Sequence, residues 1–273
     1  MESKFVKVGG IRTHYLEAGS GNDVVILLHG AEYGGNSMNS WEYNIDALAR
    51  HFHVFAVDMA GFGGTDKVFR FDDPAALRIN HIRDFMDVLC IEEAHFIGNS
   101  FGGGLILKVA SAERPAWNIK KIISISGGGP NNLETFELMN HYDGTKEYMR
   151  KIHEVLFYDE KWTTDEYVEK RYQASIQPGA WEALSAARFR SPVANKGDGF
   201  VLKPYESYHL IKSPVLICCG AEDVVKLPDY KDRMQELIPN CRVKVFEKCR
   251  HNAQIECADE FNHIAIEFLL DES

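Results

Sequence analysis

The chain has 273 residues, of which 45% are hydrophobic and 26% charged, a composition typical of a globular protein with a sizeable core. Its formal net charge of −10 argues against a nucleic-acid partner and leaves no basic patch for an anionic membrane. No apolar run approaches the roughly 18 residues of a membrane span, and no apolar stretch follows the first residues as in a signal peptide. We therefore expect a cytoplasmic protein that binds neither nucleic acid nor membrane.

The six cysteines form no C-x-x-C pair. Cys218 and Cys219 are neighbours in the apolar run 215–219, which is typical of a buried strand. Free buried thiols are the usual state in a reducing compartment. We expect no disulfide, no metal site and no cofactor.

The first expected elements are two strands, 5–8 and 12–16, joined as an antiparallel hairpin at Gly9-Gly10. Continuous apolar strands then alternate with amphipathic or apolar helices. The strands are expected at 24–28, 53–57, 94–97 and 122–125, and the helices at 41–50, 74–91 and 103–110. This alternation indicates an α/β fold with a parallel sheet covered by helices on both faces.

The alternation is interrupted after Gly127-Gly128-Gly129-Pro130. The following stretch contains helical patterns rich in aromatic residues, at 133–138, 147–157, 165–176 and 180–189. Apolar strands resume at 215–219 and 242–246, and a last helix is expected at 259–270. The sequence thus predicts an α/β core made of residues 1–130 and 211–273, with a helical cap, residues 131–210, inserted into it.

One short segment carries the main chemical signal. Gly98-Asn99-Ser100-Phe101-Gly102 lies between a predicted strand and a predicted helix, which is the context of a nucleophile elbow, G-x-S-x-G. Glycines two residues before and after the serine suit a turn too tight for Cβ atoms, in which the serine itself is strained. Ser100 is therefore the predicted nucleophile.

A serine hydroxyl needs a base, and the base needs a carboxylate to orient it. His251 follows the last predicted strand, and Asp223 follows the strand 215–219, so both lie at carboxyl ends of strands, where reactive groups collect in a parallel sheet. Glu222 and Asp229 are the alternatives to Asp223. The order Ser100, Asp223, His251 is that of α/β-hydrolases and of no other common serine-hydrolase fold.

A developing oxyanion needs two backbone N–H donors. Phe101 follows the nucleophile at a helix N-terminus, and Ala31 lies in the loop after strand 24–28; we expect these two to supply the N–H groups. Gly30 suits a loop that passes close to the substrate. His29 is expected to be structural, and Asp58 to anchor a turn, with a place in the lining of the site as the alternative.

Three segments carry a resemblance to a known family. They are Gly98-Asn99-Ser100-x-Gly102-Gly103, the region from Cys249-x-His251-x-Ala253-Gln254-x-Glu256 to Asn262, and Arg171-Tyr172-x-Ala174-Ser175-Ile176-x-Pro178-Gly179. Over nearly its whole length the chain resembles the α/β-hydrolase superfamily, and within it the meta-cleavage product hydrolases, such as 2-hydroxy-6-oxohexa-2,4-dienoate hydrolases. These enzymes cleave carbon–carbon bonds in vinylogous 1,5-diketones from the degradation of aromatic rings.

The resemblance implies a mostly parallel eight-stranded sheet with an inserted helical cap. It also implies a small-molecule substrate with a carboxylate, bound by Arg171 with a hydrogen bond from Asn99, and a homodimer as the possible assembly. Further substrate-binding positions follow by the same resemblance: Gly30, Asn39, Ser40 and Asn252.

The chain departs from the family pattern in several places. Arg250 stands where a glycine usually precedes the catalytic histidine, and Asn252 where a tryptophan often follows it. The oxyanion loop, commonly H-G-x-G-P-G, reads His29-Gly30-Ala31-Glu32-Tyr33-Gly34, and a family asparagine corresponds to Ser40, with Asn39 beside it. Two other functions remain open: an ester or lactone hydrolase on the same triad, and a small-molecule receptor with a vestigial hydrolase site. Arg171 and Asn99 favour the carbon–carbon hydrolase, because a simple esterase needs no cation there.

Overall fold

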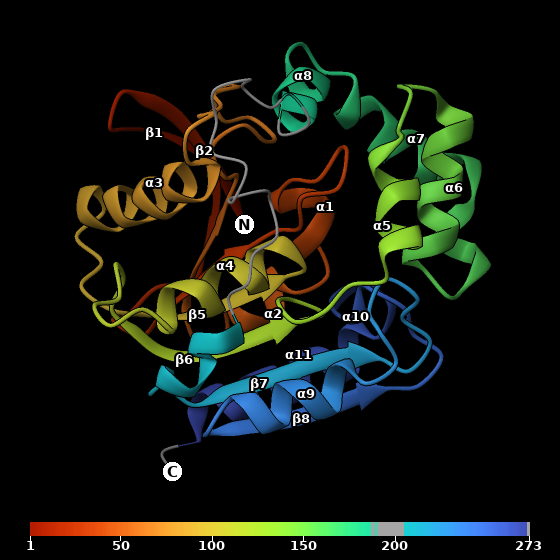
Figure 1. The fold of residues 1–273 in the computed structure, drawn as a ribbon. Coiled ribbons are helices and arrows are strands. Elements are labelled where there is room, and N and C mark those ends of the chain that lie inside the picture. Colours follow the sequence, from red (N-terminus) through yellow and green to blue (C-terminus); the bar gives the residue numbers. More distant parts are fainter. Residues whose placement is uncertain (187–188, 190–204, 272–273) are drawn as a thin grey trace.

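The computed structural model describes residues 1–186, 189 and 205–271. A single sheet runs through it in the order β1-β2-β4-β3-β5-β6-β7-β8, with helices on both faces (Figure 1). β1 pairs antiparallel with β2 and β2 antiparallel with β4, whereas all the other pairings are parallel. The strands are Glu2–Val8 (β1), Ile11–Ala18 (β2), Val24–Leu28 (β3), His53–Val57 (β4), Ala94–Asn99 (β5), Ile119–Ile125 (β6), Val215–Gly220 (β7) and Cys241–Phe246 (β8).

The helices of the core pack their apolar residues against the two faces of this sheet. One face is covered by α3, Pro74–Val88, α4, Phe101–Ala110, and α9, Tyr230–Leu237. The other is covered by α1, Ser37–Trp41, α2, Ile45–Leu48, and α11, Ala258–Leu270, with the short α10, Ala253–Glu256, before it. The predicted α/β architecture is confirmed, and β3 and β5 are buried along their whole length, as their continuous apolar runs indicated. No described helix is long and apolar enough to cross a membrane.

Two expected helices differ from the structure. The single helix predicted at 41–50 is wrong: the segment forms α1 and α2, separated by a turn at Glu42–Asn44. The break is held by Asn44, whose Nδ2 donates to the carbonyl of Gln254 and to Oδ1 of Asn262, both at 2.8 Å. The helix predicted at 74–91 ends at Val88, because Cys90 adopts the left-handed region with φ 55° and closes the helix.

The chain between β6 and β7 contributes helices and, in its described part, no strand of the sheet. The helices are α5, Leu133–Asn140, α6, Lys146–Leu156, α7, Asp165–Ser175, and α8, Ala180–Ser185, with 3₁₀ turns at Glu160–Thr163 and Tyr205–Leu210. Figure 1 shows α5, α6 and α7 side by side beyond one end of the sheet. The last residues of the helix predicted at 180–189 fall partly outside the described residues. We call the described residues within 131–210 the cap segment.

The cap segment packs on loops that follow strands of the core. Tyr33 follows β3, Val225 follows β7 and Ile255 follows β8, and all three belong to one buried apolar cluster with residues of α6 and α7. Because these loops leave the carboxyl ends of their strands, the cap segment lies over the edge of the sheet where reactive groups are expected.

The turn from β5 to α4 leaves no room for side chains at two glycines. A Cβ on Gly98 would lie 2.4 Å from the backbone nitrogen of Gly103, and a Cβ on Gly102 would lie 2.3 Å from the carbonyl oxygen of Leu28. Both contacts are with backbone atoms of packed elements, which cannot give way. The close approach of α4 to β3 and β5 therefore requires the glycines.

Gly102→Ala should lower the free energy of unfolding by about 3 kcal/mol, because the added methyl group overlaps the backbone of β3. Gly104→Ala on the same helix is the matched control, since its Cβ would have 3.1 Å to its nearest neighbour, the nitrogen of Gly128. Urea denaturation measures both. Equal stability of the two variants would contradict this account of the turn.

Candidate active site

Ser100 connects β5 to α4 in a strained conformation. Its φ is 50° and its ψ −112°, in a region that residues with a Cβ rarely adopt. The conformation is held by the serine N–H, which donates to the carbonyl of Ile125 at 2.7 Å, and by the Ser100 carbonyl, which accepts from the N–H of Gly104 at 2.9 Å. The side chain makes no capping bond to α4 and the residue is half-buried, so its hydroxyl is not committed to the helix.

His251 and Asp223 form a buried pair at the ends of β8 and β7. Nδ1 of His251 lies 2.9 Å from Oδ2 of Asp223, and their side chains are 4% and 3% exposed. Asp223 also accepts from Ser126 Oγ at 2.8 Å and from the N–H of Val225 at 2.9 Å. Burial alone would raise the pKa of Asp223, but the charge and hydrogen bond of His251, together with Ser126 and Lys226, lower it to about 2. An ionised Asp223 accepts the Nδ1 proton, which leaves Nε2 of the imidazole able to take a proton.

The alternative carboxylates are engaged elsewhere. Glu222 accepts from the N–H of Cys249 at 2.9 Å, and Asp229 pairs with Arg233 at 2.6 Å. Ser126 follows β6 directly, with a φ of 48°, and was not predicted from the sequence. Its position at the carboxyl end of a parallel strand was the one available signal.

The two expected oxyanion donors lie at the ends of adjacent strands. Phe101 is the first residue of α4, after β5, and Ala31 follows β3, which pairs with β5. The loop around Ala31 is fixed by His29, whose Nδ1 donates to the carbonyl of Gly30 at 2.7 Å while Nε2 accepts from Met59 N–H at 3.1 Å. Burial lowers the pKa of His29, so it stays neutral, and its expected structural role is confirmed.

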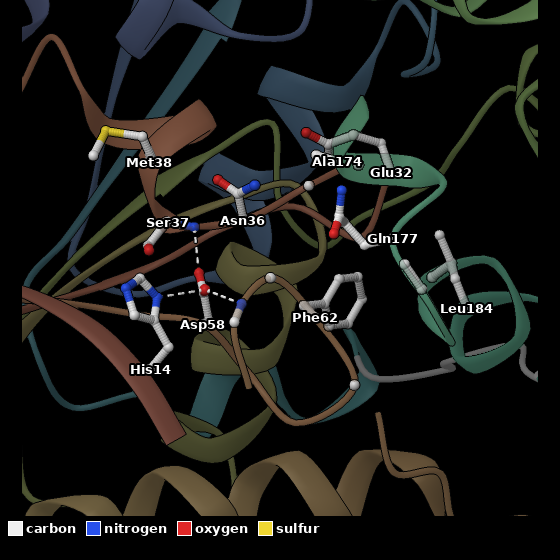
Figure 2. Close-up of a pocket in the computed structure, with 16 residues that line it drawn as sticks. His14, Glu32, Asn36, Ser37, Met38, Asp58, Phe62, Ala174, Gln177 and Leu184 are labelled. Carbon is white, nitrogen blue, oxygen red and sulfur yellow. Dashed lines mark hydrogen bonds and ion pairs between the residues drawn. The ribbon is translucent and has the colours of Figure 1, made fainter. Parts of the chain in front are cut away.

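Asp58 anchors the turn after β4, as expected. Its carboxylate accepts from the N–H of Ser37 at 2.6 Å, from the N–H of Gly64 at 2.7 Å and from His14 at 2.7 Å (Figure 2). Asp58 also lines a cavity of about 190 Å³, together with Glu32, Phe62 and Leu184. Ser100, His251 and Asp223 are not among the described residues that line this cavity. The cavity is therefore distinct from the space around Ser100.

Some side chains assigned to substrate binding are hydrogen-bonded within the protein, whereas some of their buried polar atoms have no well-formed bond in the part of the chain that the structure describes. Nδ2 of Asn39 donates to the carbonyl of Gly34 at 3.0 Å and thereby holds the oxyanion loop. Asn99 is fully buried next to Ser100, and its Nδ2 donates to the carbonyl of His251 at 3.3 Å. Among the residues assigned to substrate binding, the buried polar atoms without a well-formed hydrogen bond to the described residues are Oδ1 of Asn99, Oγ of Ser40, Nδ2 of Asn252 and Nη2 of Arg171.

Arg171 lies in α7 and already has an anionic partner. Its Nη1 lies 2.5 Å from Oε1 of Glu32, and the two side chains are 2% and 9% exposed. The same loop contacts the cap segment through Tyr33, whose ring lies 4.6 Å from that of Tyr142 and whose hydroxyl is 3.0 Å from Ser185 Oγ. The two departures from the family loop, Glu32 and Tyr33, therefore both face the cap segment.

Arg250 also connects the site to the cap segment. Its Nη1 donates to the carbonyls of Glu154 and Phe157 at the end of α6, the latter at 3.2 Å. The next residue, His251, donates its backbone N–H to the carbonyl of Leu156 at 3.1 Å. A cation at the C-terminus of a helix satisfies carbonyls that lack partners in the helix. Arg250 thus ties the loop of the predicted base to α6.

Comparison with known proteins identifies the family of the chain. The sequence profile described as the alpha/beta hydrolase fold matches residues 23–258. The 2-hydroxy-6-oxo-2,4-heptadienoate hydrolase of Pseudomonas putida is 31% identical, over 98% of this chain and 96% of that protein. The 2-hydroxymuconate semialdehyde hydrolase of a Pseudomonas species is 29% identical, over 96% of this chain and 92% of that protein.

A solved structure gives the same result. The meta-cleavage product hydrolase CumD of Pseudomonas fluorescens superposes with a TM-score of 0.86 and 33% identity, covering 97% of this chain and 96% of that one. Profile, sequence relatives and structure agree over nearly the whole length. The chain belongs to the α/β-hydrolase fold family and, within it, to the meta-cleavage product hydrolases.

Proposed function

We propose that the protein is a serine hydrolase that cleaves a carbon–carbon bond in a vinylogous 1,5-diketone, using Ser100, His251 and Asp223. The observation that carries the proposal is the combination of a strained Ser100 after β5 with a buried His251–Asp223 pair at the ends of β8 and β7. The relatives named above support the bond type, because by their names they are hydrolases of 2-hydroxy-6-oxo-2,4-heptadienoate, of 2-hydroxymuconate semialdehyde and of a meta-cleavage product.

The proposed reaction begins with a change of the substrate dienol to its keto form. Ser100 Oγ then attacks the distal ketone while Nε2 of His251 takes its proton, and the backbone N–H groups of Phe101 and Ala31 stabilise the oxyanion. The carbon–carbon bond breaks, and its electron pair stays on the departing enolate carbon, which receives the proton from His251. Water then hydrolyses the acyl group from Ser100.

In this proposal the cap segment covers the site of Ser100, and Arg171 lies at the position where the family resemblance places one end of the substrate. Glu32 is paired with one nitrogen of the same guanidinium. This ion pair therefore determines whether the site binds a charged or an uncharged substrate end. The type of bond that is cleaved is determined by Ser100, His251 and Asp223. It does not depend on the charge of the substrate end at Arg171.

The bond type is tested by mixing the protein with coloured ring-fission products and, separately, with p-nitrophenyl esters. We expect fast loss of the ring-fission colour, and a rate at least about a thousandfold lower in Ser100→Ala, because the nucleophile is gone. Ser111→Ala, a serine at the other end of α4, should retain the wild-type rate. Rapid ester turnover with no bleaching of any ring-fission product would instead favour the ester or lactone hydrolase.

The ionisation of Asp223 predicts a specific acid sensitivity. Its pKa in the folded state is depressed from 3.8 to about 2, so its contribution to stability is complete above pH 3.8 and is lost as the pH falls toward 2. Between pH 7 and pH 3 the wild type should lose about 1 kcal/mol more unfolding free energy than Asp223→Asn. Urea titrations at both pH values measure this, with Asp229→Asn behaving like the wild type. Equal losses of unfolding free energy in the wild type and in Asp223→Asn would contradict the pairing of Asp223 with His251.

Arg250→Met should loosen the contact between the loop of His251 and α6. We expect kcat to fall at least about tenfold on a ring-fission product, because a small displacement of the base is costly. Arg233→Met removes an exposed arginine and should leave kcat unchanged. An unchanged kcat in Arg250→Met would show that its bonds to α6 do not position His251.

A further inference from the structure

The oxyanion loop and the cap segment are joined by a buried ion pair, Glu32 with Arg171. Burial alone would raise the pKa of Glu32, but the charge of Arg171, the N–H of Glu32 itself and the guanidinium hydrogen bond hold it below its usual range. Burial likewise opposes the charge of Arg171, whereas Glu32 and the Tyr167 hydroxyl raise its pKa. Both groups are therefore ionised, and together they carry no net charge.

This pair lies next to the predicted oxyanion hole. Glu32 follows Ala31 directly, and its carboxylate folds back over the loop. A Cβ on Gly30 would lie 2.2 Å from Oε2 of Glu32 and 2.9 Å from Oδ1 of Asn99, so both oxygens face the same glycine. The carboxylate of Glu32 thus lies among Gly30, Asn99 and Arg171. The last two are the residues expected to receive the acid end of a substrate.

A second carboxylate is poorly accommodated in such a place. It would have to share a guanidinium whose charge Glu32 already neutralises, and it would lie close to Glu32 in a dry environment, where like charges repel strongly. Polar atoms remain for a neutral group. Oδ1 of Asn99 accepts no hydrogen bond from the described residues, and the guanidinium of Arg171, which also contacts the Tyr167 hydroxyl, has its Nη2 without a well-formed bond. A group that both donates and accepts, such as a hydroxyl or an amide, matches these atoms.

We propose that Glu32 is a specificity-determining residue that takes the place of a substrate carboxylate on Arg171, so that the site favours substrates whose end at this position is uncharged. The inference rests on the proposed use of Ser100, His251 and Asp223. It narrows the substrate class of that site to diketones with a neutral hydrogen-bonding end.

The test compares one ring-fission product as the free acid with its carboxamide, which has nearly the same shape and no charge. We expect the wild-type kcat/KM to be at least tenfold higher for the carboxamide. Glu32→Gln keeps a hydrogen-bonding side chain and frees the charge of Arg171, so the ratio should shift at least tenfold toward the acid. Glu42→Gln removes the half-buried partner of Lys170, the residue before Arg171, and should leave the ratio unchanged.

A double variant guards against effects on folding. Glu32→Gln with Arg171→Met removes both charges, so no buried ion is left unpaired, and its preference should return to the carboxamide. The proposal would be overturned if the wild type preferred the acid and Glu32→Gln showed the same preference.

Equilibrium binding of the acid and the carboxamide to Ser100→Ala, followed by calorimetry, gives the same comparison without turnover. Absence of bleaching in the wild type would refute the proposed carbon–carbon cleavage. The binding ratio would still support or overturn the role of Glu32.

Discussion

The site depends on a steric constraint at the turn from β5 to α4. Gly98 and Gly102 face backbone atoms at distances that exclude any side chain, and this close packing brings α4 onto the central strands of the sheet. Ser100, between them, is the residue that takes up the strain, with φ 50°. A strained residue persists only where its surroundings determine it, and here the surroundings are two parallel strands and a buried helix. The position of the hydroxyl therefore follows from backbone packing and does not need a side-chain bond.

Two buried carboxylates are held ionised around this turn, each by a different partner. Asp223 orients His251 from the core, whereas Glu32 connects the oxyanion loop to Arg171 of the cap segment. Because an unpaired buried charge is costly, each pair fixes the relative position of the elements that carry it. The first pair serves the proposed proton transfer, and the second, in the role proposed for Glu32, sets the charge available to a substrate end near Ser100.

Much of the fold could be predicted from the sequence because local patterns determine it. The strands 24–28 and 53–57 were predicted to the residue, since continuous apolar runs end sharply at polar residues there. The helix at 41–50 was wrong because Asn44 bonds to partners more than two hundred residues away, which no local pattern records. Glu32 and Arg171 are 139 residues apart, so their pairing required the cap segment to be placed first. Ser126 was missed for the same reason.

The central claim, that Ser100 is the nucleophile, is tested most directly by covalent labelling with a serine-directed fluorophosphonate. Intact-mass spectrometry should show one adduct per chain, peptide mapping should place it on Ser100, and ring-fission activity should fall in proportion to the labelled fraction. Ser100→Ala should take up no label. Full activity in protein whose Ser100 is completely labelled, or stoichiometric labelling at another residue with parallel loss of activity, would contradict the account.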